Sequence, residues 1–472
     1  MLPVRKQLLV LGALFLFAAG SAAGADFSAG AAKRRITPEL KPGASVWMAG
    51  FSNGRAASGL HDDLWARCLA MAAGPKPVVI CAVDAIGLFF EDVQKVREGA
   101  RATLKRDIDV IVVSTHVHEG PDTMGLWGPQ MGVSGIDEAY NRFVVDRTVE
   151  AVEEAVSALR PATARASGVT PADVVRFFDD DRPPNLNDPE IVVLAIDDLS
   201  RRRIATLVNW ASHPEALGSK NTLLTADWPW ALVRDVERGA GGIALFVNGA
   251  IGGMQSPLGA KIDDPRTGQP AAANTFRFAE IVGEYVARHV LDVAAKGRAV
   301  SLAGIEYREQ IVEIPVSNQG YLMASQAGVF KGRKPMSTTK STFTPVGYLR
   351  LVAGGKPFLE AALIPGELYP ELSVGGITRD PNADFPDAPE EKAIKRMMTA
   401  PVRMLFGLAN DEIGYIIPKA QWDEKPPYTF GAQKRWYGEV NSVGPDAAPI
   451  IIDAFSRLVS GGGRQFGNAA PK

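Results

Sequence analysis

The chain has 472 residues, 46% of them hydrophobic and 22% charged, which is the composition of a globular protein with a sizeable core. Its formal net charge of −2 argues against a nucleic-acid-binding protein, because such proteins carry a concentrated basic face. Composition leaves catalysis, binding and the oligomeric state open.

The first 25 residues are predicted to be a signal peptide. MLPVRKQ is a short basic start, LLVLGALFLFAA is an apolar run of signal-peptide length, and SAAGA offers a cleavage site after Ala25. Asp26 would then be the mature N-terminus; an uncleaved anchor helix is the alternative. No later run approaches about 18 uninterrupted apolar residues. We therefore expect an exported protein, periplasmic or secreted, with at most peripheral membrane contact.

The two cysteines follow the signal segment, in strand-like runs on either side of Gly74-Pro75. A hairpin about this turn would set Cys68 opposite Cys81, so an oxidising compartment would allow a disulfide. Two buried thiols are the alternative, because directly facing strand positions are often poorly placed for bridging.

Strand-like and helical segments alternate along the rest of the chain. Helices are predicted at 91–106, 141–160 and 276–296, and strands at 77–87, 107–116, 190–198, 203–213, 241–253, 302–314, 357–367 and 404–418. Long irregular segments, at 256–275, 317–343 and 373–395, are candidates for active-site loops. This order predicts an α/β fold: a mixed β-sheet core flanked by long helices, in a single large domain over 26–460, with a disordered tail at 461–472.

Polar residues with catalytic capacity follow several of the predicted strands. IVVSTH ends at His116, LVNWASH at His213 and LIPGE at Glu367, while the run ahead of GYIIP delivers Tyr415. Ligands gather beyond the carboxyl ends of strands in α/β sheets, and two histidines with a carboxylate are the ligand types of a hydrolytic zinc site. The alternative is that each is an ordinary loop residue.

The VSTHVHEGPD segment adds a second histidine to this group. Residues i and i+2 of a strand face the same side, so His116 and His118 could both address one pocket. Glu119 and Asp122 are candidate acceptors for the ring N–H groups of the ligands. The apolar run 123–132 either lines a substrate pocket or packs on the core. The remaining histidines, His61 and His289, are expected to be structural.

THVHEGPD resembles the T-H-T-H-S-G-P segment of the neutral (non-lysosomal) ceramidases, which are zinc-dependent amidases. Further likenesses follow in the family's order along most of the chain. They are WMAGFSNGRAASGLHDDLWAR to the family's opening region, DDDRPPNLNDPEIVVLAIDD to N-R-S-P and its strand, NWASHPEALG to F-A-x-H-P, VNGAIGGMQSP to N-x-G-D-V-S-P-N, LIPGELYPEL to P-G-E, and GLANDEIGYIIP with WYGEVNSVGP to G-L-x-N-x-Y…Y-E-G-A-S.

The resemblance implies a role for each matched residue. His116 and His213 match the zinc-binding histidines, Glu367 the zinc-binding carboxylate, and Tyr415 the tyrosine that completes the zinc site. The implied cofactor is Zn²⁺, and the implied partner is a small-molecule or lipid N-acyl substrate.

The same resemblance gives the catalytic candidates. His118 matches the second histidine of the pair, Arg182 the arginine of N-R-S-P, and Tyr437 the tyrosine of Y-E-G. Ser256 falls at the family's active-site serine when QSP is aligned with V-S-P, although no Asp precedes it and Leu258 replaces the Asn. The chain matches only the N-terminal catalytic domain of the family.

These observations predict an exported zinc amidohydrolase that acts on ceramide or a related N-acyl lipid. Two alternatives stay open: a zinc hydrolase of another ester or amide, and a non-catalytic binding protein on the same fold.

Overall fold

The structure, a computed structural model, describes residues 27–178 and 182–461. The predicted signal peptide and all of the predicted tail except Gly461 lie outside these ranges. Among the described residues, no helix is both long enough and apolar enough to cross a membrane.

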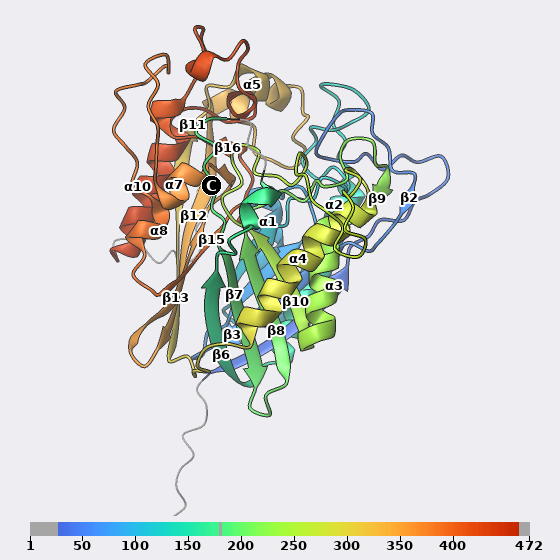
Figure 1. Cartoon of the computed structure of the whole chain (residues 1–472), viewed down its shortest axis with the longest axis vertical. Helices are drawn as coiled ribbons and strands as arrows, with labels where there is room; N and C mark the ends of the chain where they lie inside the picture. Colours follow the sequence, from blue (N-terminus) through green and yellow to red (C-terminus); the bar gives the residue numbers. More distant parts are fainter. Residues whose placement is uncertain (1–26, 179–181, 462–472) are drawn as a thin grey trace, which may run out of the picture.

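Two sheets form the centre of the described fold (Figure 1). The larger has eight strands in the order β10-β8-β7-β6-β1-β3-β4-β5, and the smaller has four in the order β11-β12-β13-β15. The large-sheet strands are β1 (Ser28–Arg35), β3 (Trp65–Ala72), β4 (Val78–Val83), β5 (Asp109–Ser114), β6 (Arg160–Val169), β7 (Ile191–Asp198), β8 (Arg203–Trp210) and β10 (Ile243–Asn248). The small-sheet strands are β11 (Gly304–Pro315), β12 (Ser341–Ala353), β13 (Lys356–Leu363) and β15 (Val402–Phe406).

Parallel and antiparallel pairs are combined in both sheets. In the large sheet β10 runs parallel to β8 and β4 parallel to β5, and in the small sheet β13 runs parallel to β15. Two short parallel pairs lie outside the sheets: β2 (Gly59–Leu60) with β9 (Leu223–Leu224), and β14 (Glu367–Leu368) with β16 (Tyr415–Ile416). The predicted mixed β-sheet core is confirmed.

Helices cover the outer faces of the two sheets. The long helices are α1 (Phe90–Leu104), α2 (Glu138–Ser157), α3 (Trp228–Ala240), α4 (Phe276–Ala294) and α10 (Ala447–Val459). The short ones are α5 (Gln319–Gln326), α6 (Met336–Thr339), α7 (Pro370–Val374), α8 (Ile394–Met397) and α9 (Tyr437–Val440). Figure 1 shows α10 on one side of the strands and α3 and α4 on the other.

The strands of the large sheet are apolar on both faces because both faces are covered. On β4, Ile80 packs with Leu349 of the small sheet, whereas Val79 packs with Val144 of α2. The layers are therefore helices, large sheet, small sheet and helix, in a single compact fold. A continuous apolar run such as VVICAV is typical of a strand covered on both faces.

The predicted hairpin register is confirmed, and the structure joins the two cysteines. Cys68 on β3 lies directly opposite Cys81 on β4, and a disulfide links them. Both side chains are fully buried beneath α1 and α2.

Some boundaries differ from prediction. The helix expected over 141–160 ends at Ser157, and β6 begins at Arg160. The irregular segment expected over 317–343 contains α5, α6 and the start of β12. Pro345 and Gly347 have low strand propensity, so β12 is not expected from sequence. In the structure β12 nevertheless pairs with β11 on one side and with β13 on the other.

Candidate metal centre

His116 lies just beyond the end of β5. Its backbone turns into the left-handed region, with φ of 66°, and its N–H donates to the Ala85 carbonyl at 2.9 Å. Its ring Nδ1 lies 2.6 Å from the Ile86 carbonyl oxygen, so Nδ1 carries the proton and donates to it. The available ring nitrogen of His116 is therefore Nε2. Because β4 and β5 are parallel, the residues that follow both strands lie at the same edge of the sheet.

His213 is held in the same way after β8. Its N–H and its Nδ1 both lie 2.8 Å from the carbonyl oxygen of Gln255, a residue that follows the parallel neighbour β10. The indole of Trp228 donates to the His213 carbonyl at 2.9 Å. These contacts leave His213 Nε2 as the available nitrogen, in a fully buried position.

Glu367 brings a carboxylate to both of these nitrogens. Its Oε2 lies 3.0 Å from His213 Nε2 and 3.5 Å from His116 Nε2. Burial alone would raise the pKa of Glu367, but His116 and then His213 hold it well below its usual range. The three residues predicted from separate strand ends therefore converge on one point.

Tyr415 is placed beside Glu367 by the short β14–β16 pair. The two residues are direct partners in this parallel ladder. The Tyr415 hydroxyl contacts the Met254 sulfur at 3.1 Å, and burial, followed by the charge of Glu367, raises the pKa of Tyr415 well above its usual value. Tyr415 lines the same cavity as Glu367 and His116.

His118 completes a cluster of three buried histidines. Nitrogen atoms of His116, His118 and His213 all lie within 4.8 Å of one another. The Nδ1 of His118 lies 3.2 Å from Glu215 Oε2. Burial lowers the pKa of His118 to about 4, against the opposing effect of Glu215, so the ring is neutral at neutral pH.

Glu215 is a site residue that the sequence analysis missed. It is 1% exposed. Burial would raise its pKa, but His118 and His213 together lower it to about 2, so it is a carboxylate at neutral pH. Its position two residues after His213, in NWASHPE, was the available signal.

The ring N–H acceptors expected at Glu119 and Asp122 were predicted wrongly. Glu119 pairs with Arg55 at 3.1 Å, and Asp122 accepts the backbone N–H groups of Met124, Gly125 and Trp127. Both carboxylates therefore hold the loop after the histidine pair, whereas main-chain carbonyls and Glu215 face the rings.

Ser256 and Tyr437 lie near the cluster. The Ser256 hydroxyl accepts the Leu258 N–H at 3.0 Å, and its side chain helps to lower the pKa of Glu215. Tyr437 is 46% exposed, lines the cavity, and stands edge-on to Tyr415 with ring centroids 5.8 Å apart.

Arg182 is buried behind α9 instead of lining the cavity. Its Nη1 binds Glu439 Oε1 at 2.7 Å, Nη2 donates to the Gln421 carbonyl, and the guanidinium lies over the Trp436 ring. These contacts brace the segment that carries Tyr437. A direct contact of Arg182 with substrate stays a prediction.

Two histidines of the cluster, His116 and His118, lie in the wall of a cavity of about 60 Å³. Its polar lining includes His116, His118, Glu367 and Tyr415, and its apolar lining includes Ile86, Phe89, Met124, Leu126, Trp127, Phe330, Met336 and Ile413. Three of these apolar residues belong to the predicted run 123–132. That run therefore lines the cavity beside the histidines.

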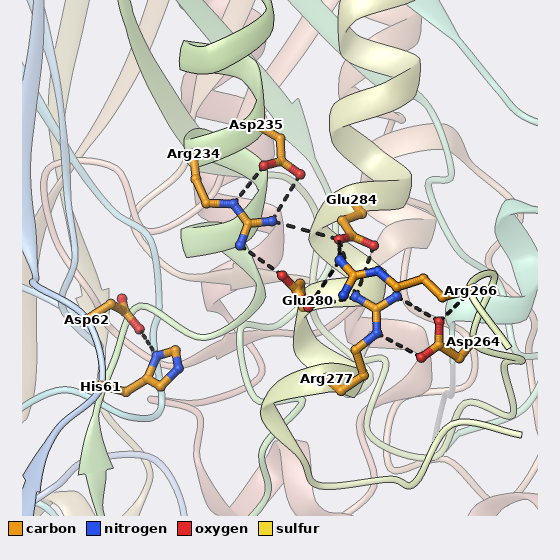
Figure 2. A network of polar contacts seen from close by, with 9 residues as sticks. All are labelled: His61, Asp62, Arg234, Asp235, Asp264, Arg266, Arg277, Glu280 and Glu284. Carbon is orange, nitrogen blue, oxygen red and sulfur yellow. Dashed lines mark hydrogen bonds and ion pairs between the residues drawn. The ribbon is translucent and has the colours of Figure 1, made fainter.

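Ion pairs fasten the loop after Ser256 to the helices (Figure 2). Arg277 of α4 binds Asp264 of this loop at 2.7 Å, and Arg234 of α3 binds Glu280 of α4 at 2.9 Å. His61 lies in the same region, where its Nδ1 contacts Asp62 at 2.8 Å. His61 is not a member of the three-histidine group among the described residues, in line with the expectation that it is structural.

The donor set fits a zinc ion. Two imidazole Nε2 atoms and a carboxylate oxygen converge within the cluster, a tyrosine hydroxyl lies beside them, and zinc accepts nitrogen and oxygen ligands of these kinds. Both ring nitrogens of His118 are shielded from solvent and make no regular hydrogen bond within residues 27–178 and 182–461. Buried polar atoms without partners are what a ligand or ion would satisfy.

No protein-family model and no curated protein sequence matches the chain. The matching solved structures include two with a TM-score of 0.69, and each of these alignments covers 94% of this chain. One is neutral ceramidase from Pseudomonas aeruginosa, with 18% identity over 76% of its chain. The other is a ceramidase complexed with C2, with 17% identity over 77% of its chain. The chain therefore has the fold of neutral ceramidase.

Proposed function

We propose that the protein is an exported zinc amidohydrolase that cleaves the N-acyl amide bond of ceramide or a related N-acyl lipid. The observation that carries this proposal is the convergence of His116 and His213 on Glu367, beside an apolar cavity that His116 and Glu367 line, on a ceramidase fold. Export rests on the basic start, apolar run and cleavage pattern of residues 1–25.

His116, His213, Glu367 and Tyr415 would hold the metal. A bound zinc ion lowers the pKa of a water molecule towards neutrality and polarises an amide carbonyl. The main-chain carbonyls at the Nδ1 atoms of His116 and His213 fix both rings, which keeps each Nε2 available.

His118 would move the proton. Its Nδ1 faces the Glu215 carboxylate, so its Nε2 is the atom that takes a proton from the attacking water and returns it to the leaving amine. Because the ring is neutral at neutral pH, it starts the cycle as a base. The Tyr437 hydroxyl, at the exposed side of the cavity, would donate a hydrogen bond to the oxyanion.

The test is to measure metal content and hydrolysis on the same preparations. Purified protein is compared with a His116→Ala/His213→Ala double variant, and His289→Ala, which alters a histidine of α4, is the matched control. We expect about one zinc per chain and hydrolysis of a fluorogenic short-chain ceramide in the unmodified protein and the control, with both lost in the double variant. Zinc without ceramide hydrolysis would move the search to other acyl substrates, and no stoichiometric metal would refute the proposal.

A further inference from the structure

Glu412 places a carboxyl group in the cavity wall. The residue is 4% exposed and lines the cavity beside Phe89 and Ile413. Its Oε1 accepts the Gly414 N–H at 2.7 Å. Its Oε2 is shielded from solvent and has no hydrogen-bond partner in the part of the chain that the structure describes. One acceptor in this wall is therefore unused.

A nearby cation does not account for this carboxylate. Arg333 also lines the cavity, but its Nη1 and Nη2 bind the two oxygens of Asp411 at 2.6 and 3.0 Å. Nη2 also donates to the Thr342 hydroxyl at 2.7 Å. Arg333 is thus committed to Asp411, and Glu412 makes no ion pair with it.

Backbone contacts fix Glu412 next to the metal cluster. The Glu412 N–H donates to Asp411 Oδ1 at 2.8 Å. Gly414 connects Glu412 to the cluster: its N–H binds Glu412, and its carbonyl accepts the Glu367 N–H at 3.1 Å. One residue, Gly414, therefore links the carboxyl of Glu412 to the backbone of Glu367, a predicted metal ligand.

Gly87 leaves the space that Glu412 occupies. A Cβ atom at Gly87 would lie 2.9 Å from the Cβ and Cγ of Glu412 and 2.5 Å from the Met124 sulfur. Such distances are too short for a side chain at position 87 without movement of the wall. The glycine at position 87 therefore leaves the room that the Glu412 side chain needs.

Resting on the amidase function proposed above, we infer that Glu412 is a specificity-determining residue whose Oε2 accepts a hydrogen bond from a substrate hydroxyl close to the scissile amide. A hydroxyl suits this place better than an ammonium group, because moving a charge into an apolar cavity is far more costly than moving a neutral donor. The protein would then select hydroxylated N-acyl lipids over plain N-alkyl amides.

Three substrates of equal chain length test this inference. One has no hydroxyl, one has a hydroxyl on the amine side next to the amide, and one has a hydroxyl at C2 of the acyl chain. The kcat/KM for each is measured with the unmodified protein, Glu412→Leu and Glu412→Gln. Glu390→Gln, which alters an exposed glutamate, is the control.

We expect the unmodified protein and the control to prefer one hydroxylated substrate by at least about tenfold, because an acceptor left unpaired disfavours the analogue that lacks the donor. Glu412→Leu should lose this preference and still hydrolyse the plain amide. Glu412→Gln, whose amide oxygen can accept, should keep part of it. A preference that survives in Glu412→Leu, or an unmodified protein that hydrolyses all three equally, would overturn the inference and leave the amidase proposal standing.

Calorimetric binding of the same compounds separates the two proposals. If the unmodified protein hydrolyses none of them, the amidase proposal fails, and equal affinity for plain and hydroxylated compounds then overturns the role of Glu412 as well. Circular dichroism confirms that Glu412→Leu folds. If it does not fold, a preference in Glu412→Gln equal to that of the unmodified protein decides against the inference.

Discussion

Replacing Glu215 with Gln should slow the reaction without removing the metal. The substitution keeps the size of a side chain that is 1% exposed and removes the charge 3.2 Å from His118 Nδ1. Loss of a comparable carboxylate partner of a site histidine costs roughly 10- to 100-fold, or about 1.4–2.8 kcal/mol. We therefore expect kcat to fall by about 10- to 100-fold.

The assay is steady-state hydrolysis of the N-acyl substrate, with metal content and unfolding temperature measured on the same samples. The loss should fall on kcat, because Glu215 orients the proton-carrying ring and does not face the apolar lining. Glu154→Gln, in an exposed ion pair with Arg34, is the matched control and should retain full activity. A kcat within about threefold of the unmodified protein, with the metal retained, would refute the orienting role of Glu215.

Three further predictions concern pH, the disulfide and the cavity. Burial raises the pKa of Asp84 from 3.8 to about 6, so the stability it contributes is present below about pH 4 and is lost as the pH rises through 6. The stability of Asp84→Asn relative to the unmodified protein should therefore rise by about 3 kcal/mol between pH 4 and pH 7 in denaturant titrations, and a constant difference would contradict this. The disulfide closes a loop with a sequence separation of 13, so Cys68→Ala/Cys81→Ala should lower the free energy of unfolding by about 3 kcal/mol; a change below about 1 kcal/mol would count against this. Gly87→Ala should raise KM several-fold at unchanged zinc content, because the new Cβ would lie 2.5 Å from the Met124 sulfur. An unchanged KM would show that the cavity wall can move to accept the methyl group.

The ends of the buried strands could be predicted from sequence because covered strands are continuous apolar runs. The runs that became β5 and β8 end within three residues of His116 and His213. Parallel pairing of β4 with β5 and of β8 with β10 then brings the following residues to one edge. The pattern could thus place each histidine after a strand, whereas their convergence depends on which strands pair.

The rest of the site depends on contacts that have no local pattern. Glu367 and Tyr415 meet through a pair of strands of two residues each, too short to give a periodic signal. Glu215 is held near His118 by a backbone contact: the His118 N–H donates to the carbonyl of Pro214, the residue before Glu215, at 3.0 Å. Arg182 was chosen by resemblance, and its burial against Glu439 depends on how α9 packs.

The surroundings of the three histidines indicate which of them would hold a metal ion. His116 and His213 each donate Nδ1–H to a main-chain carbonyl and present Nε2 to one oxygen of Glu367, at 3.5 and 3.0 Å. His118 has no such contact with Glu367 among the described residues, and its Nδ1 faces the charged Glu215 instead. Glu215 compensates part of the positive charge that His118 would gain with a proton, whereas the Nε2 atoms of His116 and His213 already face the carboxylate of Glu367. This difference favours two imidazole ligands and one proton carrier over three equivalent ligands, even though all three rings lie close enough to share one ion.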